Sequence, residues 1–148
     1  MPHDVAAPPP SVFDRFELPA ASALLGWELR AVDPAAGTIE IGFTADERFL
    51  NPAGNVQGGF LAAMLDDTQG PALFAMTGGR VYAPTIDFSV SFLKPARPGR
   101  FVGKGRVVSL GKTIAFTEAE LFDESGELVA RATFSARAMR GEMAGGPR

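Results

Sequence analysis

Residues 51–70 read NPAGNVQGGFLAAMLDDTQG, and the interpretation of the whole chain starts from them. A polar, glycine-rich loop leads into residues 60–65, which are all Phe, Leu, Ala or Met. The same composition resumes at residues 72–76, so the segment is apolar around most of its circumference, as buried helices are. The pattern predicts one long core helix from about Gln57 to Met76.

Two features of this helix are energetically unfavourable and mark a candidate site. Gly58 and Gly59 are poor helix formers, but they let a ligand approach the unpaired N–H groups of a helix start, which attract negative charge. Asp66 and Asp67 interrupt the apolar run, where a carboxylate needs partners. The two acids lie about 100° apart around the helix axis, so we expect only one of them to face a given site.

Composition and charge describe one globular domain. The 148 residues are 46% hydrophobic and 21% charged, with a formal net charge of -3, and no basic run of the kind that binds DNA occurs. The apolar segment is too short to cross a bilayer, which needs about 20 apolar residues. We therefore predict a soluble, cytoplasmic protein with no nucleic-acid partner and no membrane partner.

Cysteine and histidine usage excludes several chemistries. The chain has no Cys, and its one His is His3, near the N-terminus. Thiolate catalysis, zinc-thiolate sites, His-ligated metals and a Ser-His-Asp device are therefore unavailable to the body of the fold. We expect a site without metal or bound cofactor, built from carboxylates, hydroxyls, amides, backbone N–H groups and cations.

The rest of the chain predicts two strands before the long helix and four after it. The expected strands are residues 27–32, 38–43, 85–93, 101–108, 112–123 and 128–138. Short links between the last three indicate an antiparallel meander. Residues 11–25 predict one or two short helices, with Ser11 as N-cap and Pro19 as breaker. Because the apolar helix needs cover, we expect an antiparallel sheet of about six strands that curls around it.

These elements form a single predicted domain, residues 11–140. Residues 1–10 are rich in proline and lack the apolar core of a signal peptide, and residues 141–148 are rich in small residues. We expect both ends to be disordered tails.

A block of basic residues lies between Phe88 and Thr117, where no acidic residue occurs. Its six members are Lys94, Arg97, Arg100, Lys104, Arg106 and Lys112. Such a block can bind a phosphorylated ligand. Long basic side chains also commonly decorate the solvent face of strands, and both interpretations stay open.

Three motifs occur in a fixed order. The first, N-x-x-G-x-x-Q-G-G followed by six residues and D-x-x-x-G, begins at Asn51. The second, T-x-D-x-x-V-x-F-L-K-P-A-x-x-G, spans residues 85–99, and the third, V-V-S-L-G-K-T-I-A-F-T, spans residues 107–117. Together, over roughly Gly26 to Ala138, they resemble the hotdog-fold acyl-CoA thioesterases of the phenylacetate-degradation (PaaI-like) type.

The resemblance implies an α+β hotdog fold and hydrolysis of a coenzyme A thioester to a free acid and CoA. Coenzyme A is then part of the substrate. The implied catalytic residues are the carboxylate of Asp66, the oxyanion-binding N–H of Gly58, the thioester-binding amide of Gln57, and the supporting side chains of Asn51 and Thr85. The candidate substrate-binding residues are Gly59 at the helix start and, from the basic block, Lys94 and Lys112, which could bind the phosphates of coenzyme A. The acyl group, aliphatic or aromatic, is not specified.

Gln57 departs from the family pattern, because this position is commonly His in the PaaI-like branch. An amide can donate a hydrogen bond to a thioester oxygen, but it cannot titrate. This keeps open a second function, a hotdog protein that binds acyl-CoA as a sensor or scaffold without turnover.

Three candidates also have purely structural interpretations. Asp66 could cap a buried group, Thr85 could serve strand propensity, and Asn51 before a proline could simply form a turn.

Spacing along the helix predicts a dimer. Gln57 and Asp66 are nine residues apart, about 13.5 Å along a helix, whereas groups that act on one carbonyl must all reach it. We therefore expect a two-fold homodimer with antiparallel central helices, in which Gly58 of one chain approaches Asp66 of the other. The sheets would join edge to edge, and two dimers would pair into a homotetramer.

Overall fold

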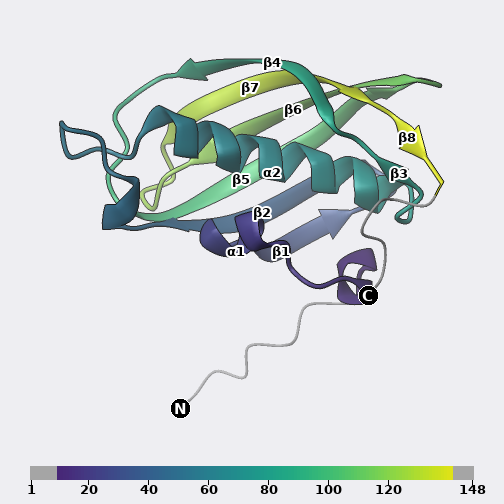
Figure 1. Ribbon diagram of the computed structural model, residues 1–148, viewed down its shortest axis with the longest axis horizontal. Helices are drawn as coiled ribbons and strands as arrows, with labels where there is room; N and C mark the ends of the chain where they lie inside the picture. The colour runs from purple at the N-terminus through teal and green to yellow at the C-terminus, as the bar shows by residue number, and fades with distance from the viewer. Residues whose placement is uncertain (1–9, 142–148) are drawn as a thin grey trace.

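The computed structural model describes residues 10–141 as one curved sheet wrapped around one long helix (Figure 1). The elements are η1 (Val12–Arg15), α1 (Ala20–Leu24), β1 (Glu28–Asp33), β2 (Thr38–Ala45), η2 (Glu47–Phe49), α2 (Gly58–Met76), β3 (Val81–Tyr82), β4 (Thr85–Phe92), β5 (Gly99–Leu110), β6 (Ile114–Phe122), β7 (Leu128–Arg137) and β8 (Met139–Arg140). Apart from Pro10 and Gly141, the two predicted tails lie outside the described residues. None of the helices within residues 10–141 is long and apolar enough to cross a membrane.

The main sheet has six antiparallel strands in the order β1-β2-β5-β6-β7-β4. The predicted α+β hotdog architecture, with about six strands around one helix, is confirmed. The meander of β5, β6 and β7 is also confirmed, whereas β4 pairs with β7 at the far edge and not with β5, its neighbour in sequence. The pair β3–β8 was not predicted, because two-residue strands carry no readable periodicity.

Two glycines of β5 let α2 lie close to the sheet. A Cβ built on Gly103 would lie 2.2 Å from Thr68 Oγ1, and one on Gly105 would lie 3.0 Å from Thr68 Cγ2. Both distances are shorter than normal contact, so these strand positions require glycine. Thr68 is fully buried at this crossing. The crossing therefore sets how deeply the middle of α2 sits in the fold.

The N-terminal segment completes the hydrogen bonding of α2. Pro71 lies inside the helix and has no N–H to donate to the carbonyl of Asp67, four residues earlier. The Trp27 indole N–H donates to that carbonyl instead, at 3.2 Å. The Trp27 ring also packs edge-on against Phe13, with 5.4 Å between ring centroids. As predicted, Ser11 caps the first short helix, η1.

Candidate functional site

Asp66 lies in the middle of α2 and faces the start of β4. Its Oδ1 accepts a hydrogen bond from Thr85 Oγ1 at 2.6 Å and another from Gln69 Nε2 at 3.2 Å. Within residues 10–141, no hydrogen bond or ion pair engages Asp66 Oδ2. One oxygen of the carboxylate is therefore held by two donors, and the other has no partner among the described residues.

Gln69 contacts Asp66 and was not among the residues that the sequence singled out. Its side chain is only 1% exposed, and its Oε1 accepts a hydrogen bond from Thr117 Oγ1 at 2.7 Å. Gln69 Nε2 also donates to Thr85 Oγ1 at 3.2 Å. These bonds connect α2, β4 and β6 beside Asp66. The available signal was spacing, because residues three apart share a helix face.

Asp67 points toward a different side of α2 from Asp66, as the angular spacing predicted. Its Oδ2 is buried and has no hydrogen-bond partner in the described part of the chain. Burial raises the pKa of Asp67 to about 6, the Ser22 hydroxyl of α1 lowers it, and the negative charge of Asp66 raises it. Asp67 therefore lies in the contact between α1 and α2.

The start of α2 is an open set of hydrogen-bond donors. The helix begins at Gly58, and Gln57, in the N-cap position, is exposed and makes no side-chain capping bond. In the structure of residues 10–141, the N–H groups of Gly58 and Gly59 have no protein acceptor. A Cβ on Gly59 would meet no atom within 4 Å. These unpaired N–H groups can bind a developing oxyanion.

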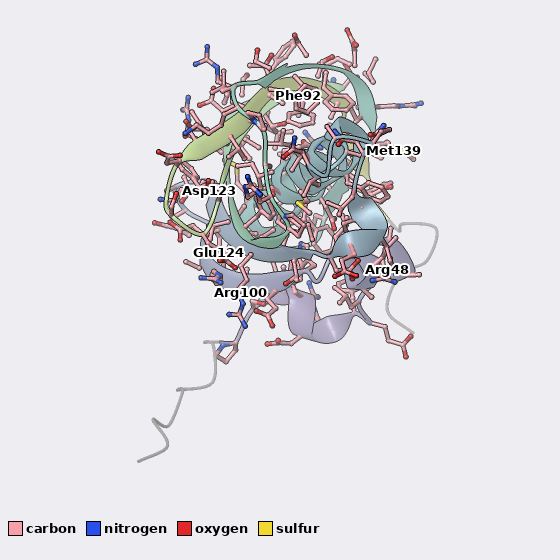
Figure 2. The ribbon with its side chains drawn as sticks, turned by 90° about the vertical axis from the view of Figure 1, so that its left-hand side faces the viewer. Arg48, Phe92, Arg100, Asp123, Glu124 and Met139 are labelled. Carbon is pink, nitrogen blue, oxygen red and sulfur yellow. The ribbon has the colours of Figure 1, made fainter. Side chains whose placement is uncertain are left out.

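The two halves of the predicted site lie apart within one protomer. Phe92, at the end of β4, lies over the start of α2, where a Cβ on Gly58 would be 3.2 Å from Phe92 Cζ (Figure 2). Thr85, at the beginning of the same strand, bonds to Asp66. Gly58 and Asp66 are eight residues apart, about 12 Å along the helix. One chain does not bring them to the same carbonyl.

The other predicted residues lie in loops. Asn51 Oδ1 accepts from two N–H groups of its own loop, at 3.0 and 3.1 Å, which is the turn-forming contact. Lys94 forms an ion pair with Glu127 near the end of β4, and Lys112 is exposed in the turn between β5 and β6. The site does not bring these three side chains together with Asp66. Their roles in catalysis and binding remain predictions.

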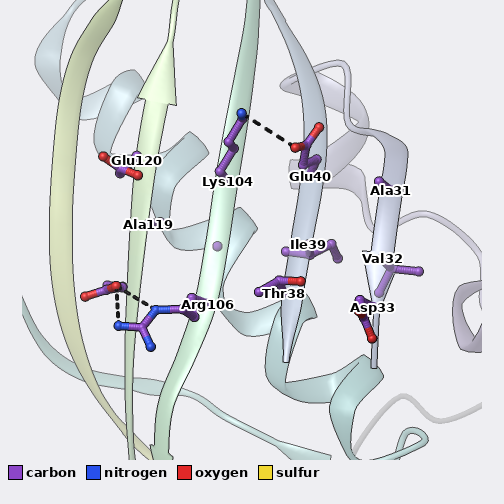
Figure 3. A pocket seen from close by; sticks show the side chains of 12 residues that line it. Ala31, Val32, Asp33, Thr38, Ile39, Glu40, Lys104, Arg106, Ala119 and Glu120 are labelled. Carbon is purple, nitrogen blue, oxygen red and sulfur yellow. Dashed lines mark hydrogen bonds and ion pairs between the residues drawn. The ribbon is translucent and has the colours of Figure 1, made fainter. Parts of the chain in front are cut away.

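A shallow hollow of about 410 Å³ crosses the sheet face that points away from α2 (Figure 3). Two ion pairs line it, Lys104 with Glu40 at 3.6 Å and Arg106 with Glu118 at 2.7 Å. Acids and bases here neutralise each other, so these two members of the basic block decorate a solvent face. Neither here nor elsewhere in residues 10–141 do three His, Cys, Asp or Glu side chains group closely enough to hold a metal ion.

Comparison with known proteins places this geometry in a family. The family model of the thioesterase superfamily matches residues 53–130. A phenylacetic acid degradation-related protein of Ralstonia eutropha JMP134 has a TM-score of 0.80 and 36% identity, covering 85% of this chain and 95% of that chain.

Two more distant structures share the fold. The PaaI protein of the E. coli phenylacetic acid degradation operon has a TM-score of 0.73 and 20% identity, covering 83% of this chain and 86% of its own. A Streptococcus mutans UA159 protein, solved bound to acetyl-CoA, has a TM-score of 0.69 and 20% identity, covering 79% and 91%. With the family model and the R. eutropha protein in agreement, the chain belongs to the thioesterase superfamily.

Proposed function

We propose that the protein hydrolyses acyl-CoA thioesters, with Asp66 as general base or nucleophile. The observation that carries the proposal is the half-held carboxylate, whose Oδ1 is bonded by Thr85 and Gln69 while Oδ2 is bonded by no described residue. Membership of the thioesterase superfamily supports the reaction class. The acetyl-CoA in the S. mutans structure supports a CoA thioester as the ligand.

In the general-base route, Asp66 Oδ2 takes a proton from water as the water oxygen adds to the thioester carbon. The carbonyl oxygen becomes negative and is held by Gly58 N–H and the Gln57 amide of a second copy, at the positive end of α2. The C–S bond then breaks, and the CoA sulfur takes the proton back from Asp66. In the nucleophilic route, Asp66 Oδ2 adds to the carbon directly, and the C–S bond breaks to give an anhydride and CoA thiolate. Water then cleaves the anhydride to the free acid and Asp66, and the CoA sulfur takes up the remaining proton.

This mechanism requires a two-fold homodimer, and the free edge of β4 supports one. Within the main sheet, β4 pairs only with β7, and it exposes Ile86 and Phe92 by 58% and 52%. Antiparallel pairing of β4 with its copy would place the start of one strand against the end of the other. Asp66 lies beside the start of β4, and Gly58 lies beside its end. Asp66 of one chain would then meet Gly58 of the other.

One face of α2 also suits close approach of a second helix. Gly59, Ala63, Asp66 and Gly70 recur at helical spacing along it, and each is at least partly exposed. A Cβ on Gly59 or Gly70 would meet no atom within 4 Å. Small residues on this face let two helix backbones come together beside the carboxylate.

Asp66→Asn tests the proposal by release of free thiol from short, medium, long and aromatic acyl-CoAs. We expect kcat to fall by about 10²- to 10⁴-fold, because the amide can neither take the proton nor attack. Asp67→Asn is the matched control, since it changes the adjacent acid on another side of the helix, and should retain turnover. Full turnover by a folded Asp66→Asn protein would show that the mechanism is wrong.

A second candidate function is acyl-CoA binding without turnover, and Gln57 favours it. This side chain cannot titrate, and it stands exposed at the start of α2. Calorimetric binding of acyl-CoAs by wild-type protein that releases no thiol from any of them would support this function and exclude the enzyme.

A further inference from the structure

We propose that Gln69, held by Thr117, is a positioning residue that fixes the orientation of the Asp66 carboxylate. This inference rests on the proposed catalytic role of Asp66. Gln69 lies three residues further along α2 and is almost completely buried, so it is too enclosed to touch a substrate. Any effect on catalysis must pass through the side chains to which it is bonded.

The chemistry of the groups fixes the direction of these hydrogen bonds. An ionised carboxylate only accepts, so the Gln69 amide must present its NH₂ group to Asp66. Its carbonyl oxygen then faces Thr117, whose hydroxyl donates to it at 2.7 Å. A flipped amide would set its oxygen against the Asp66 oxygen and lose that bond, whereas the Thr117 hydroxyl could donate to or accept from either end of the amide. The Asp66 carboxylate therefore selects the amide orientation, and Thr117 holds the buried carbonyl end of Gln69 in place.

The same amide also fixes the proton of Thr85. Gln69 Nε2 donates to Thr85 Oγ1 at 3.2 Å, so this oxygen is used as an acceptor. The single hydroxyl proton of Thr85 then points to Asp66 Oδ1, at 2.6 Å. Oδ1 receives both donors. The carboxylate cannot exchange its two oxygens without breaking both bonds, which keeps Oδ2 available for the reaction.

Burial of a glutamine in this position is not explained by packing alone. The surrounding helix is apolar, and an unsatisfied buried amide costs about 1–3 kcal/mol. A methionine or leucine would fill the space without that risk. Because the network joins α2, β4 and β6, it holds Asp66 from elements of the rigid sheet and helix rather than from loops.

Gln69→Met tests the role, because methionine keeps the length of the side chain and removes its N–H donors. We expect kcat to fall by about 10- to 100-fold, because the Asp66 carboxylate is no longer held in one orientation. KM should not change. Thr117→Val, which removes only the hydroxyl, should lower kcat less, and Thr117→Ser should restore it. Thr68→Ala is the matched control, because it removes an equally buried hydroxyl that donates only to the Met64 carbonyl of its own helix and adds no bulk at the crossing with β5.

Crystallography tests the role of Gln69 without an activity assay, so it separates this inference from the proposed thioesterase function. Crystal structures of the wild type and Gln69→Met should show the Asp66 carboxylate turned away from Thr85 or present in two orientations in the variant. An unchanged carboxylate overturns the inference, whatever happens to kcat. If the wild type releases no thiol, the proposed function fails, and the crystal comparison still decides the role of Gln69. Thr117→Val serves for the same comparison if Gln69→Met does not fold.

Discussion

Asp66 and Asp67 are chemically identical neighbours that the fold places in opposite circumstances. Asp66 is bonded by two donors, whereas Asp67 Oδ2 is buried without one in the described residues. Burial raises the pKa of Asp67 from 3.8 to about 6. The folded protein therefore holds this proton more tightly than the unfolded chain does. The resulting stabilisation is fully present below pH 3.8 and is lost as the pH rises through about 6.

Asp67→Asn removes that pH dependence, because its amide stays neutral. We expect the variant to match the wild type near pH 4 and to be more stable by about 3 kcal/mol at pH 8, from about two pKa units at 1.36 kcal/mol each. Urea unfolding at both pH values measures the difference. A stability difference between variant and wild type that is the same at pH 4 and pH 8 would contradict the burial argument.

Candidate residues with local signals in the sequence were predicted, and Gln69, whose position depends on the fold, was not. Asp66 stands out because a carboxylate is rare in an apolar helix, and the motif added Thr85, which contacts it. Gln69 carries only the weaker signal of its spacing, three residues from Asp66, because its partner Thr117 lies 48 residues away in sequence. Only the closing of β6 over α2 explains why a glutamine is buried there.

The close crossing of α2 over β5 depends on Gly103. Substitution of this glycine tests whether the crossing constrains the position of α2. Gly103→Ala would place a methyl group 2.2 Å from the buried Thr68 Oγ1, so helix and strand must separate. We expect a loss of about 1–3 kcal/mol in the free energy of unfolding. The displaced α2 should also lengthen the Asp66–Thr85 hydrogen bond and lower kcat.

Gly42→Ala is the matched control, because Gly42 is also a buried strand glycine, and its Cβ would meet only the flexible side chain of Arg30 at 2.7 Å. Urea unfolding and thiol release of both variants make the comparison. Equal stability of Gly103→Ala and Gly42→Ala would show that the close crossing does not constrain the fold.

Helices and strands with a clear hydrophobic periodicity were predicted. The long-range contacts between them were not. The long helix was predicted through Pro71, where a helix normally breaks. It continues because the Trp27 indole replaces the missing donor to Asp67, an interaction invisible in the sequence. The position of β4 beside β7 was not predicted either, because strand order depends on which faces meet and not on alternation.

The two sheet edges of the molecule differ, and the difference favours one dimer geometry. β1 exposes Glu28, Arg30 and Asp33 and contains an irregularity between Leu29 and Ala31, features that discourage pairing. β4, on the opposite side of the molecule (Figure 1), exposes apolar side chains along its length. In the proposed dimer, a two-fold axis beside β4 would cover this surface and would also complete two sites.

Mixing of subunits from two inactive variants tests whether each site contains residues of two chains. The first variant is Asp66→Asn, and the second is Gly58→Pro. Proline is favoured as the first residue of a helix and removes the N–H. Its ring requires a small shift of Phe92, which would lie 3.2 Å from a Cβ at this position and is exposed enough to move. Gln57, with φ -56° and ψ 134°, already has a backbone that a following proline accepts. Gly58→Pro should therefore fold and lack the oxyanion donor, while Asp66→Asn lacks the base.

In a mixed dimer of these two variants, one site contains both defects and the other contains neither. Random reassembly of equal amounts makes half of the dimers mixed, each with one intact site, so about one quarter of wild-type activity should return. Joint refolding from urea followed by thiol release measures it, with each variant refolded alone as control. If the mixture is no more active than the separate variants, Gly58 and Asp66 do not act together across a two-fold axis, because a site confined to one chain cannot be rescued by another.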